Sequence, residues 1–159
     1  IKIGLDTSMR KTEILSIRRE HINLQQLVIY IPKAKAGARE QPITADLGEY
    51  LAAYVATLRP GEQWLFASPA AKDGRTVNLD KPFRRCVLAA GLDVKQVVRH
   101  TLRHTAITHL VQAGVDLPTV KRISGHKNLS MVERYSHQNG AHIQTAMDKL
   151  SQRYKVTVN

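Results

Sequence analysis

Residues 27–43 read LVIYIPKAKAGAREQPI, and this stretch decides the fold class. Leu27–Pro32 is an apolar, β-branched run of the kind that forms strands, and Arg39–Ile43 is interpreted as its partner. Between them lies Lys33–Ala38, which contains Gly37, a residue typical of turns. The pattern predicts an antiparallel β-hairpin.

Helical patterns surround the hairpin on both sides. Asp80 and Asp116 are expected to cap two of the helices, because a carboxylate can accept a hydrogen bond from the free N–H groups of the first turn. The short segment Trp64-Leu65-Phe66 is expected in the core. The expected helices are residues 10–18, Thr44–Leu58, Asp80–Ala90, Arg99–Ala113, Asp116–Gly125, Ser130–Ser136 and Ala141–Arg153. The sequence therefore predicts one α+β domain, mainly α-helical, with a single small antiparallel sheet.

Composition narrows the class of protein. The 159 residues hold 24 Lys and Arg against 13 Asp and Glu, a net charge of +11. Such an excess indicates a polyanionic partner, with nucleic acid ahead of an anionic membrane surface. The single cysteine, Cys86, excludes an internal disulfide, and no apolar run is long enough to span a membrane. A cytoplasmic protein is expected.

Four short patterns, in a fixed order, hold the candidate functional residues. They are Thr7-Ser8-Met9-Arg10 followed by Glu13, the box His100–Thr105, the pair Gly125-His126, and the segment Glu133–His137 with Tyr135 at its centre. Each pattern alone is unremarkable, since a surface arginine, an exposed helix pair or a core tyrosine would explain it. Together and in order, they indicate one site.

The residue types suit the chemistry of a phosphodiester. His100 and Arg103 lie three positions apart on an expected helix and so share a face. The guanidinium of Arg103 can grip two phosphate oxygens, and Arg10 can supply a second such fork. Tyr135 offers a phenolic oxygen as a nucleophile. No metal-ligand set of usual spacing is present, so neither a metal nor another cofactor is expected.

These patterns resemble those of the tyrosine recombinases, the phage-integrase family. The resemblance runs from Thr7 to about Gln152 and includes the Lys-bearing hairpin between the first two patterns. It implies that residues 1–159 form the catalytic domain, a mainly α-helical domain with a small sheet. Members usually carry a core-binding domain as well, which would precede Ile1. Ser8 departs from the family pattern, which usually has glycine there.

The resemblance also implies a role for each site residue. Arg10 and Arg103 correspond to the two phosphate-binding arginines, His100 to the histidine that positions phosphate and moves protons, and His126 to a phosphate hydrogen-bond donor. Tyr135 corresponds to the nucleophile that forms a 3′-phosphotyrosine link.

The general acid for the 5′-oxygen leaving group would be a hairpin lysine. Lys35 is preferred to Lys33, because it precedes the turn and the Arg39-x-x-Pro42 segment much as the family lysine does. The turn spacing fits neither lysine fully.

The implied function is site-specific DNA integration or recombination without metal or ATP, typical of a phage or mobile element. The implied partners are double-stranded DNA with recombination sites, three further copies of the chain in a tetramer, and DNA-bending accessory proteins. Residues 140–159 are expected either to pass to a neighbouring protomer, as the resemblance implies, or to form a helix packed on the domain's own core. Three alternatives stay open: a type IB topoisomerase-like enzyme, a DNA-binding regulator without chemistry, and a phosphodiesterase or RNase that uses His100 and His126 as acid and base.

The remaining polar residues are expected to be structural. Glu13 would orient the site, and His104 and Thr105 would pack near it and support its residues. His109 and Cys86 are expected in the core, while His137 and His142 are expected at the surface.

Overall fold

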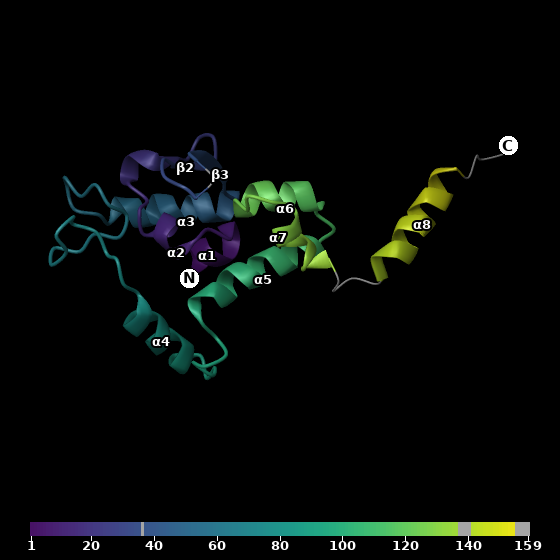
Figure 1. The fold of residues 1–159 in the computed structure, drawn as a ribbon. Coiled ribbons are helices and arrows are strands. Elements are labelled where there is room, and N and C mark those ends of the chain that lie inside the picture. Colours follow the sequence, from purple (N-terminus) through teal and green to yellow (C-terminus); the bar gives the residue numbers. More distant parts are fainter. Residues whose placement is uncertain (36, 137–140, 155–159) are drawn as a thin grey trace.

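A computed structural model describes residues 1–35, 37–136 and 141–154 (Figure 1). It contains helices around one three-stranded antiparallel sheet of order β1-β2-β3. The expected α+β, mainly helical fold is confirmed. The elements are α1 (Lys2–Thr7), α2 (Lys11–Ile14), a 3-10 turn η1 (Arg19–His21), β1 (Ile22–Asn23), β2 (Val28–Ile31), β3 (Arg39–Pro42), α3 (Ala45–Ala56), α4 (Asp80–Ala89), α5 (Arg99–Gln112), α6 (Leu117–Ser124), α7 (Ser130–Glu133) and α8 (Ala141–Arg153).

The predicted hairpin is present. Strands β2 and β3 pair antiparallel, with Ile29 opposite Gln41 and Ile31 opposite Arg39. The inward side chains Ile29 and Ile31 are buried, whereas Tyr30 between them is exposed, which is the alternation of a half-buried strand. Strand β1 adds an edge of two residues that no sequence pattern indicated.

The helix expected over residues 10–18 is wrong in its extent. Helix α2 covers only four residues, and α1 precedes it. Between the two helices Ser8 adopts a left-handed conformation with φ of 54°, and Arg10 is extended as the N-cap of α2. Leu15 and Ile17 are buried but lie beyond the end of α2. The apolar residues there therefore reflect burial in the core and not a longer helix.

Two apolar clusters hold the domain together. The first joins the sheet to α1 and α3, and its fully buried members include Ile29, Leu47 and Leu65. The second joins α5, α6 and α7, and its members are Ile107, Val111, Val120, Val132 and Tyr135. Helix α1 contacts α5, which brings the two clusters side by side and places the N-terminal arginine near the C-terminal half.

Helix α4 and its surroundings differ from expectation. Leu79, not Asp80, is the N-cap, and Asp80 instead forms an ion pair with Arg99. Cys86 on α4 is exposed and not a core residue. Of the Trp64–Phe66 segment, only Leu65 is fully buried.

Trp64 is half-buried and has two guanidinium groups over its ring. They belong to Arg18, 4.6 Å from the ring centroid, and Arg75, 5.6 Å from it. Its indole N–H donates to the Asp73 carbonyl oxygen. Trp64 therefore contacts polar groups near the surface and is not a core residue.

Helix α8 lies away from the body of the domain (Figure 1). Its apolar residues Ile143, Met147 and Leu150 are 74%, 54% and 46% exposed. In the described ranges, none of the helices is both long and apolar enough to cross a membrane.

Candidate active site

Arg10 is fixed by three contacts. Its backbone N–H donates to Glu13 Oε2 at 3.0 Å, and its Nη1 donates to Glu13 Oε1 at 3.1 Å. Its Nη2 donates to the carbonyl oxygen of Gly125, 115 positions along the chain, at 3.0 Å. Because Glu13 is buried, this carboxylate holds the arginine in one place, as expected for a residue that orients the site.

Arg103 reaches the same place from the middle of α5. Its side chain is buried, with Nη1 donating to the Ser8 carbonyl oxygen at 2.5 Å and Nη2 lying 3.0 Å from His126 Nε2. Burial and the nearby positive charge of Arg10 lower the pKa of Arg103 to about 10, so it remains charged at pH 7. Arg10 and Arg103 therefore bind adjoining backbone and side-chain groups of one short segment, Gly125-His126.

His126 is buried and neutral. Arg103 can only donate hydrogen bonds, so His126 Nε2 must be the acceptor and Nδ1 must carry the proton. Nδ1 then donates to Ser124 Oγ at 2.7 Å. Burial, followed by the charges of Arg103 and Arg10, lowers the pKa of His126 to about 4.

A third arginine, Arg39, completes this largely buried polar cluster, although the sequence interpretation gave it no role. Its Nη2 donates to Glu13 Oε2 at 3.3 Å, and its Nη1 donates to Gln41 and to the Ile123 carbonyl oxygen. A Cβ on Gly125 would lie 2.9 Å from Arg39 Nε. Strand β3 is thereby tied to the carboxylate that positions Arg10.

Tyr135 is 5% exposed, with its ring in the second apolar cluster. Its Oη lies 2.6 Å from His104 Nδ1 and accepts a hydrogen bond from Arg134 Nη2 at 3.2 Å. The guanidinium of Arg134 also lies 5.1 Å from the centroid of the tyrosine ring. His104 is exposed and not packed in the core, and it contacts the phenol directly, which fits the expectation of a residue that supports the site.

The structure does not bring the other predicted site residues into this cluster. Lys33 and Lys35 are exposed in the β2–β3 loop, and His100 is exposed in the first turn of α5. Within the described residues, no hydrogen bond or ion pair joins these three side chains to Arg10, Arg103 or His126.

Of the other histidines, His109 is exposed, so the expectation of a core histidine is wrong. His137 and the side chain of His142 lie outside the described residues.

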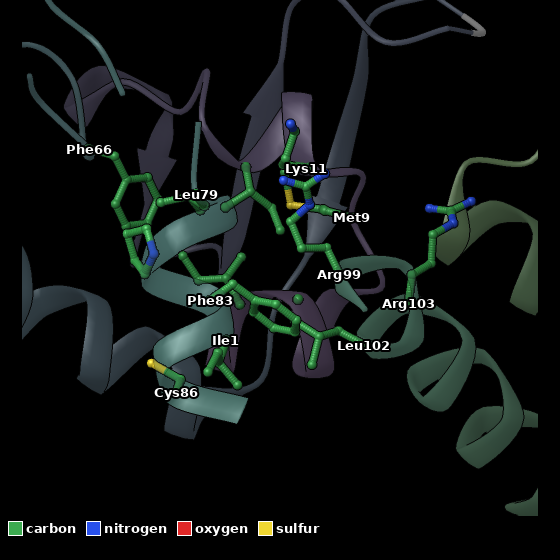
Figure 2. A pocket seen from close by; sticks show the side chains of 14 residues that line it. Ile1, Met9, Lys11, Phe66, Leu79, Phe83, Cys86, Arg99, Leu102 and Arg103 are labelled. Atoms are coloured by element: carbon green, nitrogen blue, oxygen red, sulfur yellow. The ribbon is translucent and has the colours of Figure 1, made fainter. Parts of the chain in front are cut away.

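An apolar cavity of about 250 Å³ lies beside the site, between α1, α4 and α5 (Figure 2). Phe83 and Leu102 form its floor, and Cys86 lies at one edge. Arg103 lies at the opposite edge with its guanidinium turned away from the apolar residues. Most of this lining is apolar, although the cationic residues Lys11, Arg99 and Arg103 also border the cavity.

Comparison with known proteins gives one consistent result. The family model described as "Phage integrase family" matches residues 1–142. Tyrosine recombinase XerD of Staphylococcus epidermidis is 31% identical over 137 residues, which cover 82% of this chain and 46% of XerD. The chain therefore spans less than half the length of this relative.

Solved structures agree. The chain is similar to XerH site-specific recombinase bound to palindromic difH substrate, with 26% identity and a TM-score of 0.74 over 92% of this chain and 43% of that one. It also shares its fold with the Tn1549 transposon integrase in complex with circular intermediate DNA. There the identity is 20% and the TM-score 0.77, over 93% of this chain and 57% of that one.

Proposed function

Since the chain belongs to the phage integrase family, we propose that it cuts and rejoins DNA at specific sites through a 3′-phosphotyrosine intermediate on Tyr135. The observation that carries the proposal is the convergence of Arg10 and Arg103 on Gly125-His126. Two fixed guanidinium groups and a histidine, drawn from three distant segments, suit a phosphate under attack. Tyr135 lies on the segment that follows His126 and borders the same helix, α5.

The arginines stabilise the transition state. Attack on a phosphodiester adds negative charge to the non-bridging oxygens, and preorganised donors offset that charge without reorganising. Arg10 and Arg103 keep N–H groups beyond those used within the protein, because a guanidinium has five. His126 presents an acceptor nitrogen to Arg103, and it becomes a phosphate donor once a bound phosphate draws a proton onto Nε2.

The proposed reaction transfers the phosphoryl group from the 5′-oxygen of DNA to the tyrosine. Tyr135 Oη loses its proton and bonds to phosphorus, the bond to the 5′-oxygen breaks, and that oxygen takes a proton from a general acid. Lys35 is the proposed acid, with Lys33 as the competitor, since both lie on the loop beside Arg39. His100 lies one turn before His104 on α5 and is proposed to contact the phosphate when DNA binds.

The proposed partners follow from charge and from α8. A net charge of +11 favours duplex DNA. The exposed residues Ile143, Met147 and Leu150 form an apolar stripe that a neighbouring copy can cover, as in a tetramer on two duplexes. Accessory DNA-bending proteins and action in the bacterial cytoplasm belong to the same proposal.

The test is formation of a covalent adduct. The protein is incubated with a library of end-labelled, nicked duplexes of randomised sequence, and products are separated on a denaturing gel, with and without EDTA. We expect an adduct that resists EDTA, and Tyr135→Phe should lose it while still retaining labelled DNA on a filter.

Other results identify other functions. An adduct with Tyr135→Phe contradicts the mechanism. DNA binding without any adduct indicates a regulator, free cleaved ends without an adduct indicate a phosphodiesterase, and relaxation of supercoiled plasmid without strand exchange indicates a topoisomerase.

A further inference from the structure

The hydroxyl of Tyr135 has one neighbour that can only donate and one that can accept. Arg134 is a donor only, so its N–H must point at a lone pair of Tyr135 Oη. The phenolic hydrogen is thereby free to point at His104 Nδ1, 2.6 Å away. In this arrangement, with the phenol as donor, His104 carries its proton on Nε2 and has an open lone pair on Nδ1.

The surroundings of His104 keep that lone pair available. Partial burial lowers the pKa of His104, and the charges that face it act in the same direction. These are Arg134 from the end of α7, and His100 and Arg103 from α5. Because the histidine is still exposed on its outer side, a proton received at Nδ1 can leave through Nε2 to solvent.

We propose that His104 is the base that takes the phenolic proton of Tyr135 as the tyrosine attacks, a role that rests on the proposed function. The proton passes from Tyr135 Oη to His104 Nδ1, and the oxygen's electron pair forms the bond to phosphorus. The 5′-oxygen leaves with a proton from the general acid, and His104 returns its proton when the DNA strand is rejoined. Arg134, which donates to the same oxygen, stabilises the phenolate character that develops.

The proposal separates His104 from His100. His100 was the sequence-based candidate for moving this proton, but within the described residues the hydrogen-bond partners of Tyr135 Oη are His104 and Arg134. Both histidines lie on one face of α5, four positions apart, so His100 stays free for the phosphate.

The experiment measures the single-turnover rate of adduct formation against pH for four proteins, on a duplex recovered from the library above. His104→Ala should be slower by ~10²-fold or more, the usual contribution of a general base. It should also lose the fall in rate toward acid pH that protonation of His104 causes in the wild type. His104→Asn keeps a hydrogen-bond acceptor near the position of Nδ1 but no basic group, and should be equally slow. His109→Ala, on the same helix and exposed, should match the wild type.

Added imidazole supplies the missing base. It should restore the rate of His104→Ala in proportion to its unprotonated concentration and leave Tyr135→Phe inactive. A second measurement needs no DNA: in a long-range ¹H–¹⁵N spectrum at pH 7, His104 Nδ1 should be unprotonated.

Each contrary result overturns the proposal. His104→Asn at the wild-type rate with an unchanged pH profile shows that the residue only positions the tyrosine. A faster His104→Ala shows that the contact restrains Tyr135. A protonated Nδ1 removes the acceptor, whatever the rates. Absence of an adduct with the wild type overturns the proposed function itself, whereas slow His100→Ala with normal His104→Ala overturns only this inference.

Discussion

The buried arginine cluster and the β2–β3 loop make opposite use of positive charge. Arg10, Arg39 and Arg103 are each held by hydrogen bonds to distant segments, whereas Lys33 and Lys35 are exposed. A guanidinium offers several donors in a fixed plane and can be locked while still presenting N–H groups to a ligand. An ammonium on a flexible stem is held by what it binds. If the proposed roles hold, the phosphate site is formed before DNA binds, and the proposed general acid is positioned by the DNA.

The largest expected effect comes from a change in the hydrogen-bonded arginine cluster. Arg103→Lys keeps the charge but loses the planar fork that holds Ser8 and His126 while presenting N–H groups to phosphate, so adduct formation should fall by ~10³-fold. The rate of adduct formation measures it, with Arg85→Lys on the exposed face of α4 as the control. A loss below tenfold would show that charge alone is enough there.

The next largest effect is expected from the exposed lysines of the β2–β3 loop. Lys35→Ala should slow cleavage by ~10²-fold, the usual contribution of a general acid. A 5′-bridging phosphorothiolate should restore the rate, because its sulfur leaves without protonation. Rescue of Lys33→Ala in place of Lys35→Ala would exchange the two assignments.

A third effect measures how far the buried cluster depends on a neutral histidine. The pKa of His126 in the folded protein is about 4, below the ordinary 6.5, so between these values the unfolded chain binds more protons. The free energy of unfolding should therefore decrease as the pH is lowered from 6.5 to 4. The expected decrease is about 2 kcal/mol after allowance for screening. Urea unfolding of wild type and His126→Gln at several pH values measures it. Equal slopes for the two proteins would contradict the assignment of a neutral His126.

The smallest effect concerns Ser8, whose carbonyl oxygen holds Arg103. Ser8 has φ of 54° and a buried hydroxyl for which the described structure offers no hydrogen-bond partner. Ser8→Gly should stabilise the fold by about 1 kcal/mol, because glycine adopts this conformation freely and removes the unpaired hydroxyl. Ser8→Ala removes only the hydroxyl and separates the two contributions in denaturant unfolding. A destabilised Ser8→Gly would show that the hydroxyl has a partner.

Local signals made much of the fold predictable. Thr44 and Asp116 cap α3 and α6 as their types predict, and Gly125 ends α6 with φ of 65°. The break between α1 and α2 was not predictable, because Ser8 turns there to present its carbonyl oxygen to Arg103, a partner 95 positions away. The prediction for His109 was wrong for a related reason: apolar spacing on α5 does not tell which side of the helix the second cluster covers.

The candidate site divides in the same way. Ordered patterns identified Arg10, Arg103 and His126, which the structure brings together. The contact of His104 with Tyr135 depends on how α7 packs against α5, which no local pattern encodes. Arg39 lies in the β2–β3 hairpin, but its part in the site depends on a tertiary contact: it shares the carboxylate of Glu13 with Arg10.

Gly125 has a consequence for anyone who builds chimaeras from related domains. At this one position the carbonyl oxygen accepts from Arg10, and the space that a side chain would fill is occupied by Arg39. A crossover placed between the hairpin and α6 would pair an arginine from one parent with a backbone shaped by the other. The transferable block is thus discontinuous in sequence, comprising residues 8–13, the strand with Arg39 and the end of α6, and these parts must be exchanged as a set.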